Sequence, residues 1–297
     1  MNKFDISFYG NLIVDTVCKV DDYVEGGSNK LISKYTSLGA SANLIREMIS
    51  LNPKGLSISI DSSIGNDENG SYCKKWFNNS NKLNSSKITP FLTTSHLPTS
   101  NALIIADTNK KTRSSIVQWG ACTAHDNFTN HDSKWKHFLY IDAMTKIDEE
   151  HLKFLSNCSI VSVDFCLSNH TEEQVNRIYS MLKYVDYIFI SDVEAMSITG
   201  MKNLNEISAN LANKSRGYCI LHTPKGSHIS DGNTTNEVKT EFVNDTALDV
   251  LGAGDVFCAS FIDYAMKFEK ENVLQSAKFA HENTTKYLLN NKGTQNG

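Results

Sequence analysis

Short runs of β-branched and aromatic residues alternate with stretches of helical periodicity along most of this 297-residue chain. The alternation predicts strands at Phe4–Tyr9, Leu56–Ile60, His137–Asp142, Ile160–Phe165, Tyr187–Ser191 and Tyr218–Thr223. Between them the spacing of apolar residues predicts helices at Ser41–Leu51, Glu149–Ser156, Thr171–Leu182 and Leu204–Ala212. Strands that alternate with helices favour an α/β fold, with a mainly parallel central sheet flanked by helices.

Two segments, at about residues 12–38 and 96–120, break this alternation. The second contains the apolar runs ALIIAD and SSIVQW on either side of the turn-like TNKKTR. Extended runs joined by turns are typical of hairpins, so we expect both segments to form a small β-sheet lid, separate from the main sheet. The sequence has no internal repeat and no Pro/Gly-rich linker. We therefore expect the lid to be an excursion from a single domain that spans residues 1–297.

Composition narrows the classes of partner. The chain has 29 Lys and Arg against 33 Asp and Glu, and its formal net charge of -4 gives no general attraction to nucleic acid or to an anionic membrane. No apolar run is long enough to span a bilayer, and the first residues lack a basic segment followed by a continuous apolar one. We expect a cytoplasmic protein with neither kind of partner.

The seven cysteines form no CxxC pair and no Cys/His spacing suited to zinc. Buried free thiols are therefore expected at all seven positions, rather than disulfides or metal ligands.

The run DVLGAGDVFCASFIDYAM, from Asp249 to Met266, carries the most chemistry. Gly252 and Gly254 lack side chains, and a helix begins there, because apolar residues then recur at helical spacing. A glycine turn at a helix start offers unpaired N–H groups and the positive end of the helix dipole to an anion. Asp255, held ionised by the same field, would accept a proton from a hydroxyl. This arrangement outlines a phosphoryl-transfer site, and a plain tight turn with an acidic helix cap is the alternative.

Two other phosphate-binding patterns are absent from the sequence. It contains no GxxxxGK[ST] and no GxGxxG after the first predicted strand. P-loop and dinucleotide-binding interpretations therefore lose their main support.

Four segments together resemble the ribokinase-like (PfkB) sugar and nucleoside kinases. The family signature DTTGAGD is matched at Asp249 and at Gly252–Asp255, with Val250 and Leu251 in place of two threonines. Leu38–Asn43 is similar to the family's GGAxxN segment, and Ser63–Gly70 is similar to its (V/I)GxDxxG segment. The run GNLIVD, with Gly10 and Asp15, is similar to the family's first strand and its substrate-binding Asp. These landmarks occur in the family order and cover almost the whole chain.

The resemblance implies a role for each matching position. Asp255 resembles the catalytic base, and the turn of Gly252, Ala253 and Gly254 resembles the anion hole for the transferred phosphoryl group. The positions that hold the acceptor hydroxyls are matched by Asp15, Gly39 and Asn43. Arg113, in the lid, would approach the substrate or a phosphate, with a solvated turn residue as the alternative.

The resemblance also implies ATP and Mg²⁺ as cofactors, at positions where this chain departs from the family. The TxGxxG nucleotide loop is shortened to Thr223–Gly226, which lacks the first glycine, and Gly254 faces the same nucleotide. His281 stands where the family often has Asn, beside the adenine, and a plain surface histidine is the alternative. The NxxE element of the magnesium-phosphate network keeps its Glu as Glu194, but Ser191 replaces its Asn.

We expect ATP-dependent phosphorylation of a hydroxyl on a small sugar-like acceptor, because no aromatic pair can be assigned to stacking a base. A nucleoside kinase is one alternative. A catalytically impaired binding or regulatory protein is another, favoured by Ser191 and the shortened Thr223–Gly226 loop. Relatives that pair through their lid sheets imply a homodimer.

Overall fold

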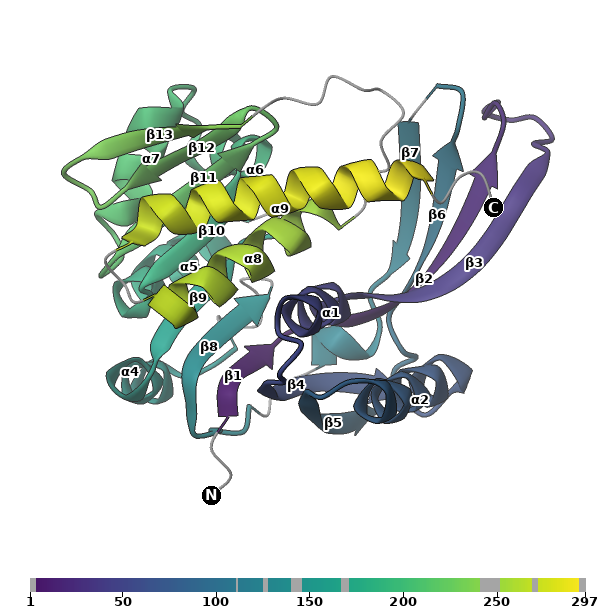
Figure 1. Cartoon of the computed structure of the whole chain (residues 1–297), viewed down its shortest axis with the longest axis horizontal. Coiled ribbons are helices and arrows are strands. Elements are labelled where there is room, and N and C mark those ends of the chain that lie inside the picture. The colour runs from purple at the N-terminus through teal and green to yellow at the C-terminus, as the bar shows by residue number, and fades with distance from the viewer. Residues whose placement is uncertain are drawn as a thin grey trace.

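The protein is described by a computed structural model for residues 4–110, 112–124, 128–139, 146–166, 171–240, 252–268 and 272–293. Within these residues a nine-stranded sheet lies between two layers of helices, and a four-stranded sheet projects to one side (Figure 1). The strands of the large sheet are β1 (Phe4–Tyr9), β4 (Ser57–Gly65), β5 (Lys87–Ser95), β8 (Ser133–Leu139), β9 (Ile160–Asp164), β10 (Tyr187–Ser191), β11 (Tyr218–Thr223), β12 (Gly226–Ser230) and β13 (Thr235–Lys239).

The large sheet has the order β13-β12-β11-β10-β9-β8-β1-β4-β5. From β5 to β11 every neighbouring pair is parallel, and only β12 and β13 join antiparallel at the edge. The predicted mainly parallel sheet is confirmed. Its parallel strands end along one carboxyl edge, where ligands of open α/β sheets bind.

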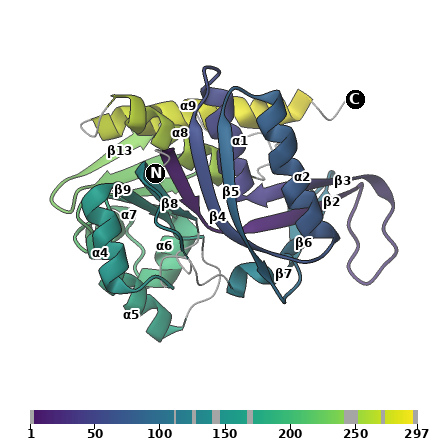
Figure 2. The same ribbon diagram turned by 90° about the horizontal axis from the view of Figure 1, so that it is seen from below.

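The helices form two layers on opposite faces of the large sheet (Figure 2). One apolar core packs α1 (Ser41–Leu51), α2 (Glu68–Leu83), α8 (Ala253–Phe268) and α9 (Val273–Gly293) against the sheet. A second core, on the other face, contains apolar residues of α4 (Glu149–Cys158), α5 (Glu172–Met181), α6 (Asp192–Thr199) and α7 (Leu204–Ala212). Short 3₁₀ turns at Ala121–Ala124 and Leu182–Tyr184 complete the described elements.

The second sheet is built from the two segments that broke the alternation. It contains β2 (Leu12–Val20), β3 (Leu31–Ala40), β6 (Asn101–Asp107) and β7 (Thr112–Gln118), in the order β3-β2-β6-β7. A small apolar cluster of Ile13, Val17, Ala102 and Ile104 joins its strands. The predicted small separate sheet is confirmed, whereas the treatment of the whole chain as one domain stays a prediction.

Some predicted bounds were wrong. The strand predicted at His137–Asp142 begins earlier, at Ser133, and is described only to Leu139. The strand predicted at Leu56–Ile60 continues to Gly65. The helix α2 was not predicted because its buried residues are only Gly70, Cys73 and Phe77, a stripe too sparse to show in the sequence.

The expectation for the cysteines was partly wrong. All seven are free thiols, as expected, but Cys158 is exposed and Cys18 and Cys166 are only half-buried. Cys158 is the last residue of α4 and is not among the buried residues of that helix. Among the described residues no helix has the length and apolarity to cross a membrane.

Candidate active site

The glycine turn sits at the start of α8. Gly252 has φ 79°, a left-handed conformation that favours glycine, and its carbonyl accepts the N–H of Val256 at 2.9 Å. The N–H groups of Ala253, Gly254 and Asp255 fall in the first turn, where no preceding helical carbonyl is available. A Cβ at Gly254 would meet only the Cε1 of His222, at 4.0 Å, within the described part. The turn can therefore admit an anion. Asp249 of the signature lies outside the described residues, as do Val250 and Leu251.

Asp255 follows this turn and is tied to α1. The Nδ2 of Asn43 donates to its Oδ2 at 2.7 Å. Burial raises the pKa of Asp255 to about 6, although the Asn43 hydrogen bond and the cations Arg46 and Arg113 lower it. The helix start was expected to favour the ionised form, but desolvation outweighs it. A carboxylate with this pKa suits proton abstraction near neutral pH.

The acceptor candidates come from the four-stranded sheet, where we expected the lid, and from α1. Asp15, on β2, is 8% exposed, and a Cβ at Gly39 on the neighbouring β3 would lie 2.1 Å from its Oδ2. Glycine at position 39 therefore makes room for the Asp15 carboxylate. Burial and, second to it, the charge of Asp255 together raise the pKa of Asp15 to about 6, so these two carboxylates lie close together. Arg113, exposed on β7, lies near enough to lower the pKa of Asp255.

The shortened Thr223–Gly226 loop is a tight turn between the antiparallel strands β11 and β12. The N–H of Lys225 donates to the Oγ1 of Thr223 at 3.0 Å. Gly226 has φ 143°, and a Cβ there would lie 2.1 Å from the carbonyl oxygen of Val238. The turn thus requires glycine at this position, even though the family's first glycine is missing.

His281, on α9, packs against this turn. It is 7% exposed, its Nε2 shares a 2.5 Å hydrogen bond with the Oγ of Ser227, and its ring lies 4.7 Å from that of Phe257. The alternative of a plain surface histidine is wrong. Burial lowers the pKa of His281 to about 4, so its ring is neutral at physiological pH.

His222 was not predicted as a site residue, and it connects the turn to the aromatic contact. It precedes Thr223 at the carboxyl end of β11, and its ring lies 5.3 Å from that of Phe257. Phe257 therefore separates two imidazoles, His222 and His281, beside the glycine turn. A histidine at the carboxyl end of a buried strand was the available signal.

Glu194 belongs to a capping box at the start of α6. Its Oε2 accepts the backbone N–H of Ser191 at 3.0 Å and the Ser191 hydroxyl at 2.6 Å. Ser191, in place of the expected Asn, is thus the N-cap of α6. Asp164, at the carboxyl end of β9, was not predicted, and burial together with the charges of Glu194 and Asp255 raises its pKa well above the usual range.

The carboxylates of Asp164 and Glu194 are the candidate ligands of the expected magnesium ion. Within the described ranges no group of three or more His, Cys, Asp or Glu side chains is arranged to hold a metal ion. Mg²⁺ is bound through one or two carboxylates together with water and substrate phosphates. The crowded carboxylates Asp164 and Glu194 therefore fit a magnesium ion that arrives with the nucleotide phosphates.

The model of the PfkB family of carbohydrate kinases matches residues 3–295 of this chain. The chain belongs to the PfkB family. Its fold is shared by the ribokinase of Thermotoga maritima, at 20% identity and a TM-score of 0.73, over 97% of this chain and 93% of that one. A nucleoside kinase of Methanocaldococcus jannaschii matches at 18% identity and 0.70, over 97% and 92%. The ribokinase of Arabidopsis thaliana, solved with ribose and ATP, matches at 14% identity and 0.72, over 97% and 93%.

Membership in the PfkB family makes this protein a phosphotransferase that acts on an alcohol group. Its structure brings Asp15, Asn43 and Asp255 together from three elements that are far apart in the sequence. His281 contacts Ser227, which follows the Thr223–Gly226 turn, and Phe257 of α8.

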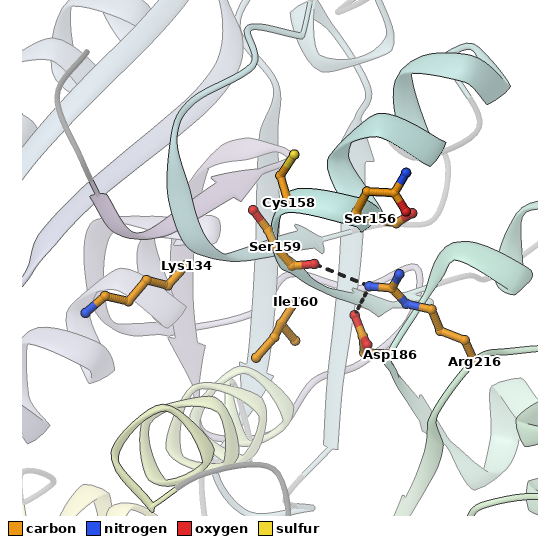
Figure 3. A pocket seen from close by; sticks show the side chains of 8 residues that line it. Lys134, Ser156, Cys158, Ser159, Ile160, Asp186 and Arg216 are labelled. Atoms are coloured by element: carbon orange, nitrogen blue, oxygen red, sulfur yellow. Dashed lines mark hydrogen bonds and ion pairs between the residues drawn. The ribbon is translucent and has the colours of Figure 1, made fainter.

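A polar cavity of about 520 Å³ lies at the other edge of the kinase's large sheet, where β9, β10 and β11 begin (Figure 3). The Nη2 of Arg216 pairs with the Oδ2 of Asp186 at 2.6 Å and donates to the carbonyl of Ser159 at 3.3 Å. Lys134, also at this cavity, pairs with Asp5 at 3.4 Å. Because these charges already have protein partners, the cavity does not compete with the glycine turn as the active site.

Proposed function

We propose that this kinase transfers a phosphoryl group from ATP to a hydroxyl of a sugar or sugar derivative, with Asp255 as the catalytic base. The observation that carries the proposal is the 2.7 Å hydrogen bond between Asn43 and Asp255 beside the open glycine turn. It joins the position that resembles the acceptor site to the positions that resemble the base and the anion hole.

The proposed chemistry needs positioning more than covalent catalysis. In a loose transition state the acceptor keeps its proton until late, so Asp255 orients the hydroxyl and accepts the proton as the new P–O bond forms. The N–H groups of Ala253, Gly254 and Asp255, which follow Gly252, would donate to the oxygens of the transferred group.

The acceptor would lie between the lid and α1. Asp15 and Asn43 offer a carboxylate and an amide, which together grip the donors and acceptors of a polyol. Gly39 keeps the Asp15 carboxylate accessible, and Arg113 would approach the acceptor or a phosphate from β7. A closed lid would keep water from the phosphoryl group.

ATP would lie along the other side of the α8 start, against Thr223, Gly226, Gly254 and His281. The contact of His281 with Ser227 and Phe257 supports this placement, because it connects the Thr223–Gly226 turn to α8. Glu194, helped by Asp164, would hold Mg²⁺, which neutralises phosphate charge when bound.

An ADP-release screen across sugars, sugar phosphates and nucleosides, with Mg²⁺ and ATP, tests the proposal. We expect turnover with a sugar or a sugar derivative. Turnover with nucleosides alone would make the protein a nucleoside kinase in place of a sugar kinase. No turnover, together with no heat in a calorimetric titration of the folded protein with ATP, would favour the regulatory protein.

We also propose that the kinase is a cytoplasmic homodimer that pairs through the lid. Free thiols at all seven cysteines suit a reducing compartment. Ile116 on β7 is 69% exposed and lies opposite the exposed Leu103 on β6, so the lid presents apolar surface. Light scattering should give a dimer for the wild type and a monomer for Ile116→Lys. A wild-type monomer at micromolar concentration would refute the pairing.

A further inference from the structure

Arg46, which the family resemblance does not assign, touches three parts of the candidate site. On α1 it lies one turn beyond Asn43, and its Nη1 donates to the Asn43 Oδ1 at 2.8 Å. Its Nη2 donates to the carbonyl oxygen of Leu38, on the lid strand β3, at 2.7 Å. Its guanidinium carbon lies 5.7 Å from the ring centroid of Trp76 on α2, which adds a cation–π contact.

These contacts determine which way the Asn43 amide points. A guanidinium can only donate hydrogen bonds, so it requires the amide oxygen of Asn43 on its own side. A carboxylate can only accept, so Asp255 requires the amide NH₂ group, which donates to it at 2.7 Å. One orientation of the amide satisfies both neighbours, and the chain Leu38, Arg46, Asn43, Asp255 is continuous.

We propose that Arg46 is a positioning residue that links the edge of the lid to the catalytic base through the side chain of Asn43. This inference rests on the proposed role of Asp255. With the amide fixed, one hydrogen of its NH₂ group goes to Asp255 and the other is left for an acceptor oxygen. A movement of the lid strand β3 would therefore reach Asp255 through the hydrogen bonds of Leu38, Arg46 and Asn43.

The charged and titratable groups around Arg46 come from every element packed against it. Asp15 on β2 and Asp255 on α8 are the anions, and the charge of Arg46 lowers the pKa of each. Tyr72 on α2 and Tyr287 on α9 also interact with its charge. Arg113 on β7 is the other cation that acts on Asp255. Loss of Arg46 therefore removes one of two cations that favour the ionised base, and frees the amide that donates to it.

The attachment of the lid edge does not depend on Arg46 alone. The hydroxyl of Tyr72 donates to the carbonyl of Thr36, two residues earlier on β3, at 3.3 Å. Tyr72→Phe therefore removes a neighbouring lid contact without touching Asn43. It is a matched control for Arg46→Met, and Arg177→Met, at an exposed position of α5, controls for the loss of an arginine.

A carboxyl ¹³C NMR titration of the protein without substrates tests the link, with Asp255→Asn used to assign the signal. We expect Arg46→Met to raise the pKa of Asp255 by about one unit, because both a cation and an oriented donor are lost. The pKa should stay unchanged in Tyr72→Phe and Arg177→Met. This readout does not need turnover, so the inference can fail or stand independently of the proposed function, which the ADP-release screen tests.

Steady-state kinetics separates positioning from charge. We expect Arg46→Met to lower kcat about tenfold at pH 8 and to raise the acceptor KM by a similar factor, since misplaced groups lose catalysis steeply. Arg46→Lys keeps the charge but not the planar pair of donors, so it should reverse only the part of the pKa rise that comes from the lost charge, and it should leave kcat low. An unchanged pKa in Arg46→Met, or full recovery of kcat and KM in Arg46→Lys, would overturn the proposal. If Arg46→Met does not fold, Arg46→Gln, which also lacks the charge, replaces it in both measurements.

Discussion

The amino and carboxyl edges of the large sheet differ in how their charged side chains are paired. At the amino edge, the buried Lys136 donates to the carbonyl of His131 at 2.8 Å, to the hydroxyl of Ser133 at 3.1 Å and to that of Ser159 at 2.8 Å. Asp186, at the same edge, accepts hydrogen bonds from both the Arg216 guanidinium and the backbone N–H of Val161. Each of these groups has hydrogen-bond partners within the protein, although burial lowers the pKa of Lys136 to about 8.

At the carboxyl edge, like charges are crowded instead. Asp255 and Glu194 both raise the pKa of Asp164, and Asp255 also raises that of Asp15. Mutual repulsion among buried carboxylates lowers the stability of the free protein, and it is relieved by a proton or by a cation. The amino edge therefore pairs its charged groups within the protein, whereas the carboxyl edge places several carboxylates together beside the candidate site.

Replacing the proposed base Asp255, at the carboxyl edge, should cause the largest loss of kcat among the variants that compare the two edges. Asp255→Asn should lower kcat by about 100-fold or more, the usual scale for a general base, because Asn cannot accept the hydroxyl proton. ATP affinity should stay within a few-fold, since the two side chains are nearly isosteric. Steady-state kinetics and calorimetry measure the two effects. Near-normal kcat in Asp255→Asn would refute the mechanism.

The pH profile should show the raised pKa of the carboxyl edge. Because Asp255 acts only when ionised and its pKa is about 6, kcat should fall as the pH falls through 6, to about a tenth of its maximum at pH 5. Asp15 titrates in the same window, with a pKa of about 6. The comparison is therefore made at saturating Mg²⁺ and ATP in wild type and Asp15→Asn. If the fall of kcat below pH 6 disappears in Asp15→Asn, Asp15 rather than Asp255 is the group that causes it.

Truncating the amide should affect the acceptor rather than the nucleotide. Asn43→Ala removes the group that we assign to an acceptor hydroxyl, so the acceptor KM should rise about tenfold, the value of one hydrogen bond of about 1.4 kcal/mol. Calorimetric ATP affinity should not change. If the ATP affinity falls while the acceptor KM is constant, the assignment of Asn43 is wrong.

A change at the amino edge should alter stability but not turnover. Asp186→Ala removes the acceptor of the Val161 N–H and leaves the Arg216 guanidinium with the Ser159 carbonyl, so it should lower the free energy of unfolding by about 1–3 kcal/mol in urea. At a temperature where the variant is folded, kcat should lie within about twofold of wild type, because the cavity beside Asp186 is remote from Asp255. A large fall in kcat in Asp186→Ala would contradict the assignment of catalysis to the carboxyl edge alone.

The sequence was sufficient for features that depend on neighbouring residues. Helix α1 occupies the predicted Ser41–Leu51, and β1, β10 and β11 have their predicted bounds, because apolar spacing and flanking turn residues act locally. The left-handed Gly252 and the start of α8 were also readable, since a glycine turn followed by a helical apolar stripe is a local pattern. By contrast, the edge strand β13 and its neighbour β12 were not predicted, because five-residue strands carry little apolar pattern.

Tertiary structure decided which distant residues meet. Asp164 and His222 entered the site only when the order of the parallel strands placed their carboxyl ends beside α8, and no local spacing encodes that order. The sequence assigned no role to Arg46, because its contact with Leu38 depends on how β3 packs against α1. The raised pKa of Asp255 also depends on this packing. The charge on a helix start can be inferred from sequence, but desolvation is set by everything that folds around it.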